Sequence, residues 1–172
     1  MTIFRASLVI FVALLAGLSA TEATAQTPPN WRSTAEINLP ENQSELRVVV
    51  RLKTRRVIVY DGKIVMGMYS IAVGKQGWET PVGEYRVLSK EVNPTFKNFK
   101  TGKIIRPGVD NPLGVRWIGF WTDGKTQIGF HGTNQPELIG QAVSHGCIRM
   151  RNKDVTNLFE QVQIGTLVVV QP

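Results

Sequence analysis

The chain has 172 residues, of which 42% are hydrophobic and 19% charged, and its formal net charge is +7 at pH 7. This length is enough for one ordinary domain and too short for two full-sized ones, and the hydrophobic content argues against a chain that is disordered throughout. The positive charge favours polyanionic partners, although a solvated basic surface without a specific partner explains it equally well.

The first 25 residues have the architecture of a secretory signal peptide. Arg5 precedes an apolar run over residues 6–18, and Ala23-Thr24-Ala25 supplies the small residues after which signal peptidases cut. An uncleaved anchor helix is the alternative, but the run is shorter than the roughly 20 residues that a spanning helix needs. We therefore expect an exported protein of the periplasm or cell wall. Cell-wall polymers and anionic lipid surfaces are then better partners than nucleic acid.

Residues 26–44 are rich in proline, asparagine, serine and threonine and have no hydrophobic period. They are interpreted as a linker or extended arm. Residues 45–172 are assigned to one domain, which opens with a β pattern. Apolar and other residues alternate over 45–52, so that one face of this strand carries Leu46, Val48, Val50 and Leu52.

A hairpin is expected next. Strands over 55–60 and 63–73 flank Asp61-Gly62, which is a strong turn signal because both residues of that tight turn need positive φ. A loop over 74–83 then leads to a single strand over 84–92.

Residues 93–114 are rich in proline and glycine and are interpreted as an extended loop or lid. Loops of this length in compact domains are usually functional or mobile, and we expect this one to form a wall of a substrate groove. Two short apolar strands follow, over 117–121 and 127–132.

One helix is predicted near the end of the domain. Asn152 is a candidate N-cap, and Gly165 suits the C-terminal end. A single apolar stripe runs along the helix through Val155, Leu158, Phe159 and Val162. With a last strand over 166–170, the pattern of many short strands and one helix predicts a mainly-β sandwich or barrel.

The chain has one cysteine and two histidines, and all three fall within residues 131–147. An exported protein usually pairs its cysteines, so a lone thiol suggests that Cys147 is used, bridged to another chain or simply buried. If residues 144–150 form one extended segment, His145, Cys147 and Arg149 share a face, while Ile148 and Met150 point to the core.

This arrangement favours nucleophilic chemistry. A neighbouring imidazolium or guanidinium lowers the pKa of a thiol, which attacks carbonyls as the thiolate. The backbone N–H groups of Gly146 and Cys147 are candidate donors to an oxyanion, and Gly146 lets a substrate approach the backbone. The residues alone therefore point to acyl transfer through a thioester.

The segment over residues 130–170 also resembles the catalytic end of an L,D-transpeptidase domain of the YkuD type. That signature is a histidine, a spacer and then [S/T]HGC, which matches His131 followed by Ser144-His145-Gly146-Cys147. TPVGEY at 80–85 and NPLG at 111–114 are similar to further segments of the family. The likeness covers roughly residues 45–172.

The resemblance implies a role for each matching residue. Cys147 is the nucleophile and His131 the general base, with the second ring nitrogen held by the carbonyl of Gly132. His145 shapes the site. Substrate binding and support of the motif fall to Ser144, Gly146 and Arg149. Arg149 stands where the shorter signature has asparagine, and Leu138 where relatives often have serine; both departures bear on substrate preference.

The implied reaction cleaves peptidoglycan stem peptides. The thiolate attacks the carbonyl of the third residue, D-alanine leaves, and the thioester passes to an amine or to water, with L,D-carboxypeptidase activity as the hydrolytic outcome. No cofactor is implied. Two other classes remain open: a non-catalytic wall-binding module, and a zinc site built from His131, His145 and Cys147.

Overall fold

The structure is a computed structural model that describes residues 46–98 and 101–172. The predicted signal peptide over 1–25 and the linker over 26–44 lie outside these residues. Strands dominate the described part, which contains one α-helix, so the predicted mainly-β fold class is confirmed. The described residues contain no helix with the length and hydrophobicity of a membrane span.

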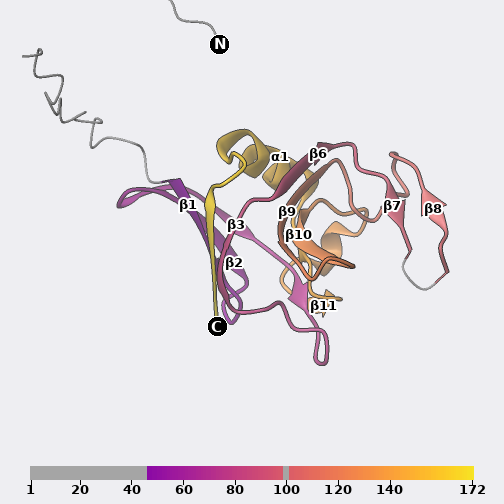
Figure 1. Ribbon diagram of the computed structural model, residues 1–172, viewed down its shortest axis with the longest axis horizontal. Coiled ribbons are helices and arrows are strands. Elements are labelled where there is room, and N and C mark those ends of the chain that lie inside the picture. Colours follow the sequence, from indigo (N-terminus) through magenta and orange to yellow (C-terminus); the bar gives the residue numbers. More distant parts are fainter. Residues whose placement is uncertain (1–45, 99–100) are drawn as a thin grey trace, which may run out of the picture. The chain divides into compact units, whose positions relative to one another are not determined.

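Two sheets carry the fold (Figure 1). The first sheet has the order β3 (Ile64–Ser70), β2 (Arg56–Asp61), β1 (Leu46–Arg51), β13 (Leu167–Gln171) and β5 (Gly83–Arg86). The second sheet has the order β12 (Ile148–Arg149), β10 (Gln127–His131), β9 (Arg116–Thr122) and β6 (Ser89–Val92).

Smaller elements complete the domain. β4 (Val73–Gly74) pairs with β11 (Ala142–Ser144), and β7 (Phe96–Lys97) pairs with β8 (Ile104–Ile105) inside the long loop. A 3₁₀ turn, η1, covers Pro136–Leu138, and the helix α1 covers Asn152–Gln161 and packs against β9 and β10.

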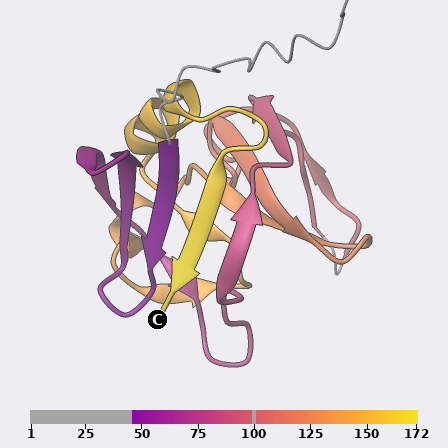
Figure 2. The same ribbon diagram turned by 60° about the vertical axis from the view of Figure 1, so that its left-hand side comes forward.

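The first sheet is built around β1. This strand pairs antiparallel with β2 on one side and parallel with β13 on the other, so Val48 lies opposite both Val59 and Val168. Figure 2 shows β13 (yellow) between β1 (indigo) and β5 (magenta). Val48 and Val50 are fully buried, with Leu46 and Leu52 packed at the edge of the same cluster, so the predicted inward face is confirmed.

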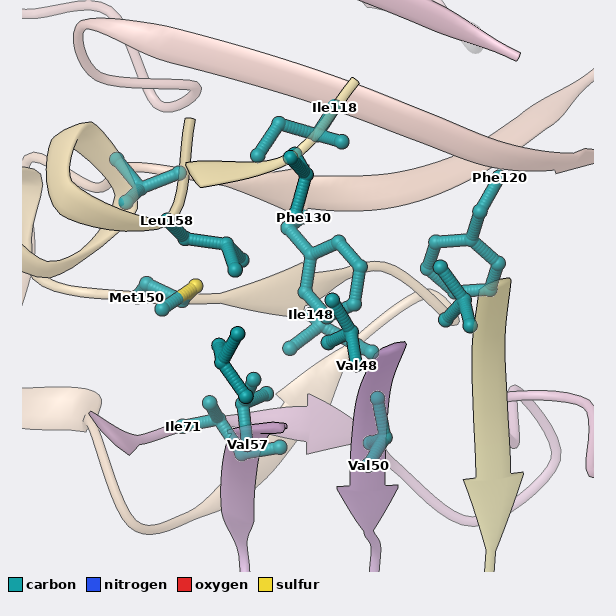
Figure 3. Packing of buried hydrophobic residues seen from close by; sticks show 14 of the residues in the cluster. Val48, Val50, Val57, Ile71, Ile118, Phe120, Phe130, Ile148, Met150 and Leu158 are labelled. Carbon is teal, nitrogen blue, oxygen red and sulfur yellow. The ribbon is translucent and has the colours of Figure 1, made fainter. Parts of the chain in front are cut away.

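The core lies between the two sheets and under the helix. Figure 3 shows Val48 and Val50 on the side of the first sheet, with Phe130 and Ile148 of the second sheet facing them. Phe130 also packs on Phe120 with ring centroids 5.0 Å apart. Leu158 of α1 closes one end of the cluster and is fully buried. Each such side chain contributes roughly 1.5–3 kcal/mol by leaving water.

A hairpin forms as predicted, since β2 and β3 pair antiparallel. The predicted turn residues are wrong: Asp61 pairs with Ile64 at the ends of the two strands, so Gly62 and Lys63 form the turn, and only Gly62 has a positive φ, at +54°. The predicted strand over 63–73 ends earlier, because β4 leaves the first sheet to pair with β11. The apolar segments expected at 117–121 and 127–132 form β9 and β10.

The prediction of one strand over 84–92 is wrong. The Val87 N–H donates to the Thr166 carbonyl beside the first sheet, and the Leu88 N–H donates to the Gly119 carbonyl of the second. The chain therefore changes sheets between β5 and β6. Val87 and Leu88 are consecutive apolar residues, so strict alternation breaks at the crossing, but such a break does not show that the chain moves to another sheet.

The apolar stripe of the helix is confirmed, with Val155, Leu158 and Val162 buried. The predicted cap is wrong: Arg151 holds the N-cap position and makes no side-chain capping bond. Asn152 instead turns its Oδ1 to the Thr133 N–H, 3.1 Å away. Gly165, at φ +90°, lies beyond the helix in the turn to β13.

Candidate active site

The cysteine motif spans a break between two strands. Ser144 ends β11, Ile148 begins β12, and Gly146 between them has φ +107°. The expected continuous extended segment is therefore wrong, because this backbone conformation interrupts the alternation of side chains. His145 is exposed and packs edge-on against Trp78, with ring centroids 4.8 Å apart, whereas Cys147 and Arg149 are half-buried.

The inward-facing half of the motif behaves as predicted. Ile148 and Met150 are fully buried in the core. β12 pairs parallel with β10, placing Arg149 opposite His131. Cys147 precedes β12 by one residue, so the thiol is held beside the strand that carries the buried histidine.

His131 ends β10 and is 5% exposed. Its Nδ1 lies 2.6 Å from the Gly132 carbonyl oxygen, the acceptor named from the resemblance. A carbonyl only accepts, so Nδ1 carries the proton and Nε2 keeps its lone pair. Burial lowers the pKa of His131 to about 4; the Gly132 bond opposes this shift and the Arg149 charge adds to it. The imidazole is therefore neutral at pH 7.

Close packing behind His131 fixes this geometry. A Cβ on Gly132 would lie 2.0 Å from Asn152 Oδ1, and a Cβ on Gly114 would lie 2.7 Å from the Gly132 Cα. Gly114 also has φ +63°. Three elements meet here, and only glycine at two positions lets them approach so closely. Trp117 stacks near the imidazole, with ring centroids 6.1 Å apart at 20°.

The Cys147 thiol faces an irregularity in β10. The register of β10 against β9 shifts between Ile128 and Gly129. Beside this shift, Sγ donates to the Gln127 carbonyl at 3.8 Å and accepts from the Gly129 N–H. A Cβ on Gly129 would lie 2.4 Å from the Ile118 carbonyl oxygen, so this segment of β10 also requires glycine.

Burial raises the pKa of Cys147, and the Gly129 hydrogen bond and the Arg149 charge lower it by less. The expectation that cationic neighbours depress this pKa is therefore wrong in sign, because His131 is neutral and burial outweighs Arg149. At pH 7 the Cys147 thiol is therefore protonated and the His131 imidazole is neutral.

The turn itself is closed by Ser144. Its Oγ donates to the Cys147 carbonyl at 2.5 Å and accepts from the Gly146 N–H at 3.2 Å. Of the two backbone donors considered for an oxyanion, Gly146 is thus engaged. The hydrogen bonds of the described residues leave the Cys147 N–H without an acceptor.

The loop between β4 and β5 packs directly on this turn. The Lys75 N–H donates to the Ser144 carbonyl at 3.1 Å, and Thr80 Oγ1 donates to the Gly146 carbonyl at 2.8 Å. Thr80 was not predicted as a site residue from the sequence. It lies 66 residues from its partner, and TPVGEY signalled only a resemblance.

Arg149 supplies the positive charge of the site. Burial lowers the pKa of its guanidinium, and the neighbouring Cys147 partly opposes this. Its Nε is buried and has no hydrogen-bond partner among the described residues. The side chain thus has an unused donor beside the thiol.

The loop over 93–114 lines a hollow of about 410 Å³ together with Thr133 and Asn134, which follow Gly132. Inside the loop, the Asn111 amide donates to the Pro94 carbonyl at 2.7 Å, and Asn111 is fully buried. That this loop forms a wall of a substrate groove stays a prediction.

The zinc hypothesis is wrong for this fold. Within residues 46–98 and 101–172, no three His, Cys, Asp or Glu side chains gather closely enough to hold a metal ion. His145 faces Trp78 at the surface, whereas His131 is buried.

Comparisons with known proteins agree with one another. The family model of the YkuD L,D-transpeptidase catalytic domain matches residues 45–170. The Bacillus subtilis protein named "Putative L,D-transpeptidase YqjB" is 44% identical over 128 residues, which cover 72% of this chain and 69% of that protein.

Solved structures show the same fold. The catalytic domain of an Enterococcus faecium L,D-transpeptidase is 27% identical with a TM-score of 0.59, and the match covers 76% of this chain and 99% of that one. An L,D-transpeptidase solved as its avibactam carbamoyl enzyme is 28% identical with a TM-score of 0.60, covering 74% of this chain and 49% of that one. The chain belongs to the L,D-transpeptidase family and carries the YkuD-type catalytic domain.

Proposed function

We propose that this protein is a peptidoglycan L,D-transpeptidase with Cys147 as its nucleophile and His131 as its general base. One observation carries the proposal. The hydrogen bond from Nδ1 to the Gly132 carbonyl leaves Nε2 as the basic atom of a buried, neutral imidazole. This imidazole lies on β10, which pairs with β12, the strand that begins directly after Cys147. A base oriented by a third group beside a nucleophile is the arrangement that covalent acyl transfer needs.

In the first step, Sγ attacks the carbonyl carbon of the third stem-peptide residue while Nε2 takes the thiol proton. The carbonyl π electrons move to oxygen and form a tetrahedral oxyanion. When the oxyanion collapses, the C–N bond to D-alanine breaks, and the amine leaves with the proton from Nε2. The product is a thioester on Cys147 and free D-alanine.

In the second step, an acceptor amine attacks the thioester and gives its proton to Nε2. Collapse of the second tetrahedral intermediate breaks the C–S bond, and the proton returns to Sγ. Water in place of the amine yields the L,D-carboxypeptidase reaction. A thioester suits this step because it is a reactive acyl donor toward amines.

The protonation states support a coupled proton transfer. The pKa of His131, at about 4, keeps the base unprotonated at pH 7, and the raised pKa of Cys147 keeps the thiol protonated. Charge separates only as the thiol attacks. Arg149 then stabilises the developing negative charge, and the Gly129 N–H supports the sulfur.

The substrate assignment rests on the family and on charge. The net charge of +7 suits an anionic envelope polymer, and Arg149 offers a cation to a stem-peptide carboxylate. We expect this activity in the periplasm or cell wall, with peripheral contact to anionic surfaces, because the first 25 residues have the architecture of a signal peptide. A relative trapped as a carbamoyl enzyme supports an acylable nucleophile in this fold.

The test is intact-protein mass spectrometry on residues 26–172 with a tetrapeptide stem ending in D-alanine. The wild type should gain the mass of the tripeptide acyl group and release D-alanine, whereas Cys147→Ala should do neither. His131→Gln, which keeps the thiol, should lose at least 100-fold in acylation rate, in the range of general-base removal. A folded wild type that forms no adduct would overturn the proposal and favour a non-catalytic wall-binding module.

A further inference from the structure

Thr80 is a buried polar residue for which the mechanism above has no use. Its side chain is 3% exposed. Oγ1 donates to the Gly146 carbonyl at 2.8 Å and accepts from the Gly74 N–H at 3.3 Å. The hydroxyl thus joins the β4–β5 loop to the residue immediately before the cysteine.

The bonded carbonyl belongs to the peptide group that contains the Cys147 N–H. A trans peptide is planar, with its C=O and N–H pointing in opposite directions, and all described peptides are trans. A hydroxyl that fixes the Gly146 carbonyl therefore also fixes the direction of the Cys147 N–H. The N–H points away from Thr80.

This peptide group needs such an anchor. Gly146 has φ +107°, and glycine offers little steric resistance to rotation of the next peptide plane. Ser144 holds the groups on either side, which are the Gly146 N–H and the Cys147 carbonyl. It does not hold the Gly146–Cys147 peptide itself, and Thr80 does.

Thr80 is itself held firmly. A Cβ on Gly74 would lie 2.0 Å from the Trp78 carbonyl oxygen and 2.8 Å from the Thr80 N, so the loop closes tightly on its own base. The Lys75 N–H binds the Ser144 carbonyl, and Trp78 packs against His145. The loop thus contacts three successive residues of the motif.

We propose that Thr80 is a positioning residue for the acyl-transfer reaction: its hydroxyl orients the Cys147 N–H toward the oxyanion that forms when Sγ attacks a carbonyl. The inference rests on the proposed role of Cys147. Accepting the hydroxyl bond also polarises the amide and strengthens its N–H as a donor. Preorganised donors of this kind act mainly in the transition state.

The test compares two reactions of Cys147 in full-length protein. Acylation by p-nitrophenyl acetate passes through a tetrahedral oxyanion, whereas alkylation by iodoacetamide displaces iodide at a saturated carbon and forms none. Thr80→Val removes the hydroxyl and keeps the shape, and Thr80→Ser keeps the hydroxyl. We expect Thr80→Val to acylate about 10- to 100-fold more slowly, Thr80→Ser to stay within about threefold of wild type, and alkylation to change less than about twofold in both.

Two results would overturn the inference: wild-type acylation in Thr80→Val, or acylation and alkylation that fall together, which would mean that Thr80 only keeps the turn folded. If Thr80→Val does not fold, Thr80→Ala is used instead, because it removes the hydroxyl without adding a contact. The same result is expected of it: slower acylation with unchanged alkylation. The stem peptide separates the two proposals. If the wild type does not react with the stem peptide, while Thr80→Val is selectively slow toward p-nitrophenyl acetate, the substrate assignment is wrong and the role of Thr80 is still supported.

Discussion

The backbone next to His131 and the turn that carries Cys147 are held in different ways. On the histidine side, Gly114, Gly132 and Asn152 pack so closely that there is no room for another carbon atom. On the cysteine side, the hydroxyls of Ser144 and Thr80 hold a turn through hydrogen bonds to its backbone. Adding a methyl group should therefore damage the histidine side, and removing a hydroxyl should damage the cysteine side.

The largest expected effect is on the histidine side. In Gly114→Ala, the new Cβ would lie 2.7 Å from both the Gly132 Cα and the Thr133 N, at φ +63°. Backbone must move, so we expect the free energy of unfolding in urea to fall by about 3 kcal/mol or more, with loss of acylation. Gly140→Ala is the matched control, with φ +96° and no atom within 4 Å of the Cβ, and should cost about 1 kcal/mol. Equal losses would show that packing at Gly114 is unimportant.

Acid should lower the free energy of unfolding through His131, which lies on the same side. The pKa of His131 is about 4 in the folded protein against an ordinary value of 6.5, so between these pH values the unfolded chain binds more protons. Stability is therefore full above pH 6.5 and falls on acidification, by about 3 kcal/mol at pH 4. Urea unfolding of wild type and His131→Gln at pH 7, 5 and 4 measures this. The difference in unfolding free energy between the two proteins should become smaller as the pH falls. A difference that stays constant would contradict the role of His131 in this pH dependence.

The smallest expected effect on stability is on the cysteine side. Ser144→Ala removes the acceptor of the Gly146 N–H and the donor to the Cys147 carbonyl. We expect unfolding free energy to fall by about 1–2 kcal/mol and acylation by p-nitrophenyl acetate to slow about tenfold. Ser144→Thr retains the hydroxyl and should recover most of the rate. If Ser144→Thr does not recover the rate, the effect of Ser144→Ala comes from the change in side-chain volume and not from the lost hydroxyl.

Local signals in the sequence were enough for much of the fold. Alternation predicted the inward face of β1, and the apolar stripe predicted the buried side of α1, because both depend only on periodicity. The crossing of the chain from one sheet to the other at Val87 and Leu88 was not predicted, because an alternating pattern does not show to which sheet a strand belongs. Asn152 was misassigned because a distant N–H, that of Thr133, outcompetes the cap.

The site shows the same division. His131 and Cys147 were identifiable from the motif and the lone thiol. The relative orientation of residues 144–150 was not, because one positive φ at Gly146 resets the alternation. Thr80 was not identifiable from spacing, since its contact closes a loop of 66 residues. The pKa of Cys147 depends on how deeply the thiol is buried, and the pattern of neighbouring residues in the sequence does not reveal this burial.

The position of β13 has a consequence for the order of events during folding. This strand lies between β1 and β5, and it pairs with β1 across more than a hundred residues of chain. Until β13 takes this place, β1 and β5 have no strand between them, and the valines of β1 lack one of their two neighbouring strands. The first sheet is therefore completed only by a pairing between distant parts of the chain, which is a slow kind of folding step, and the unfinished sheet stays exposed to chaperones and proteases until that pairing forms.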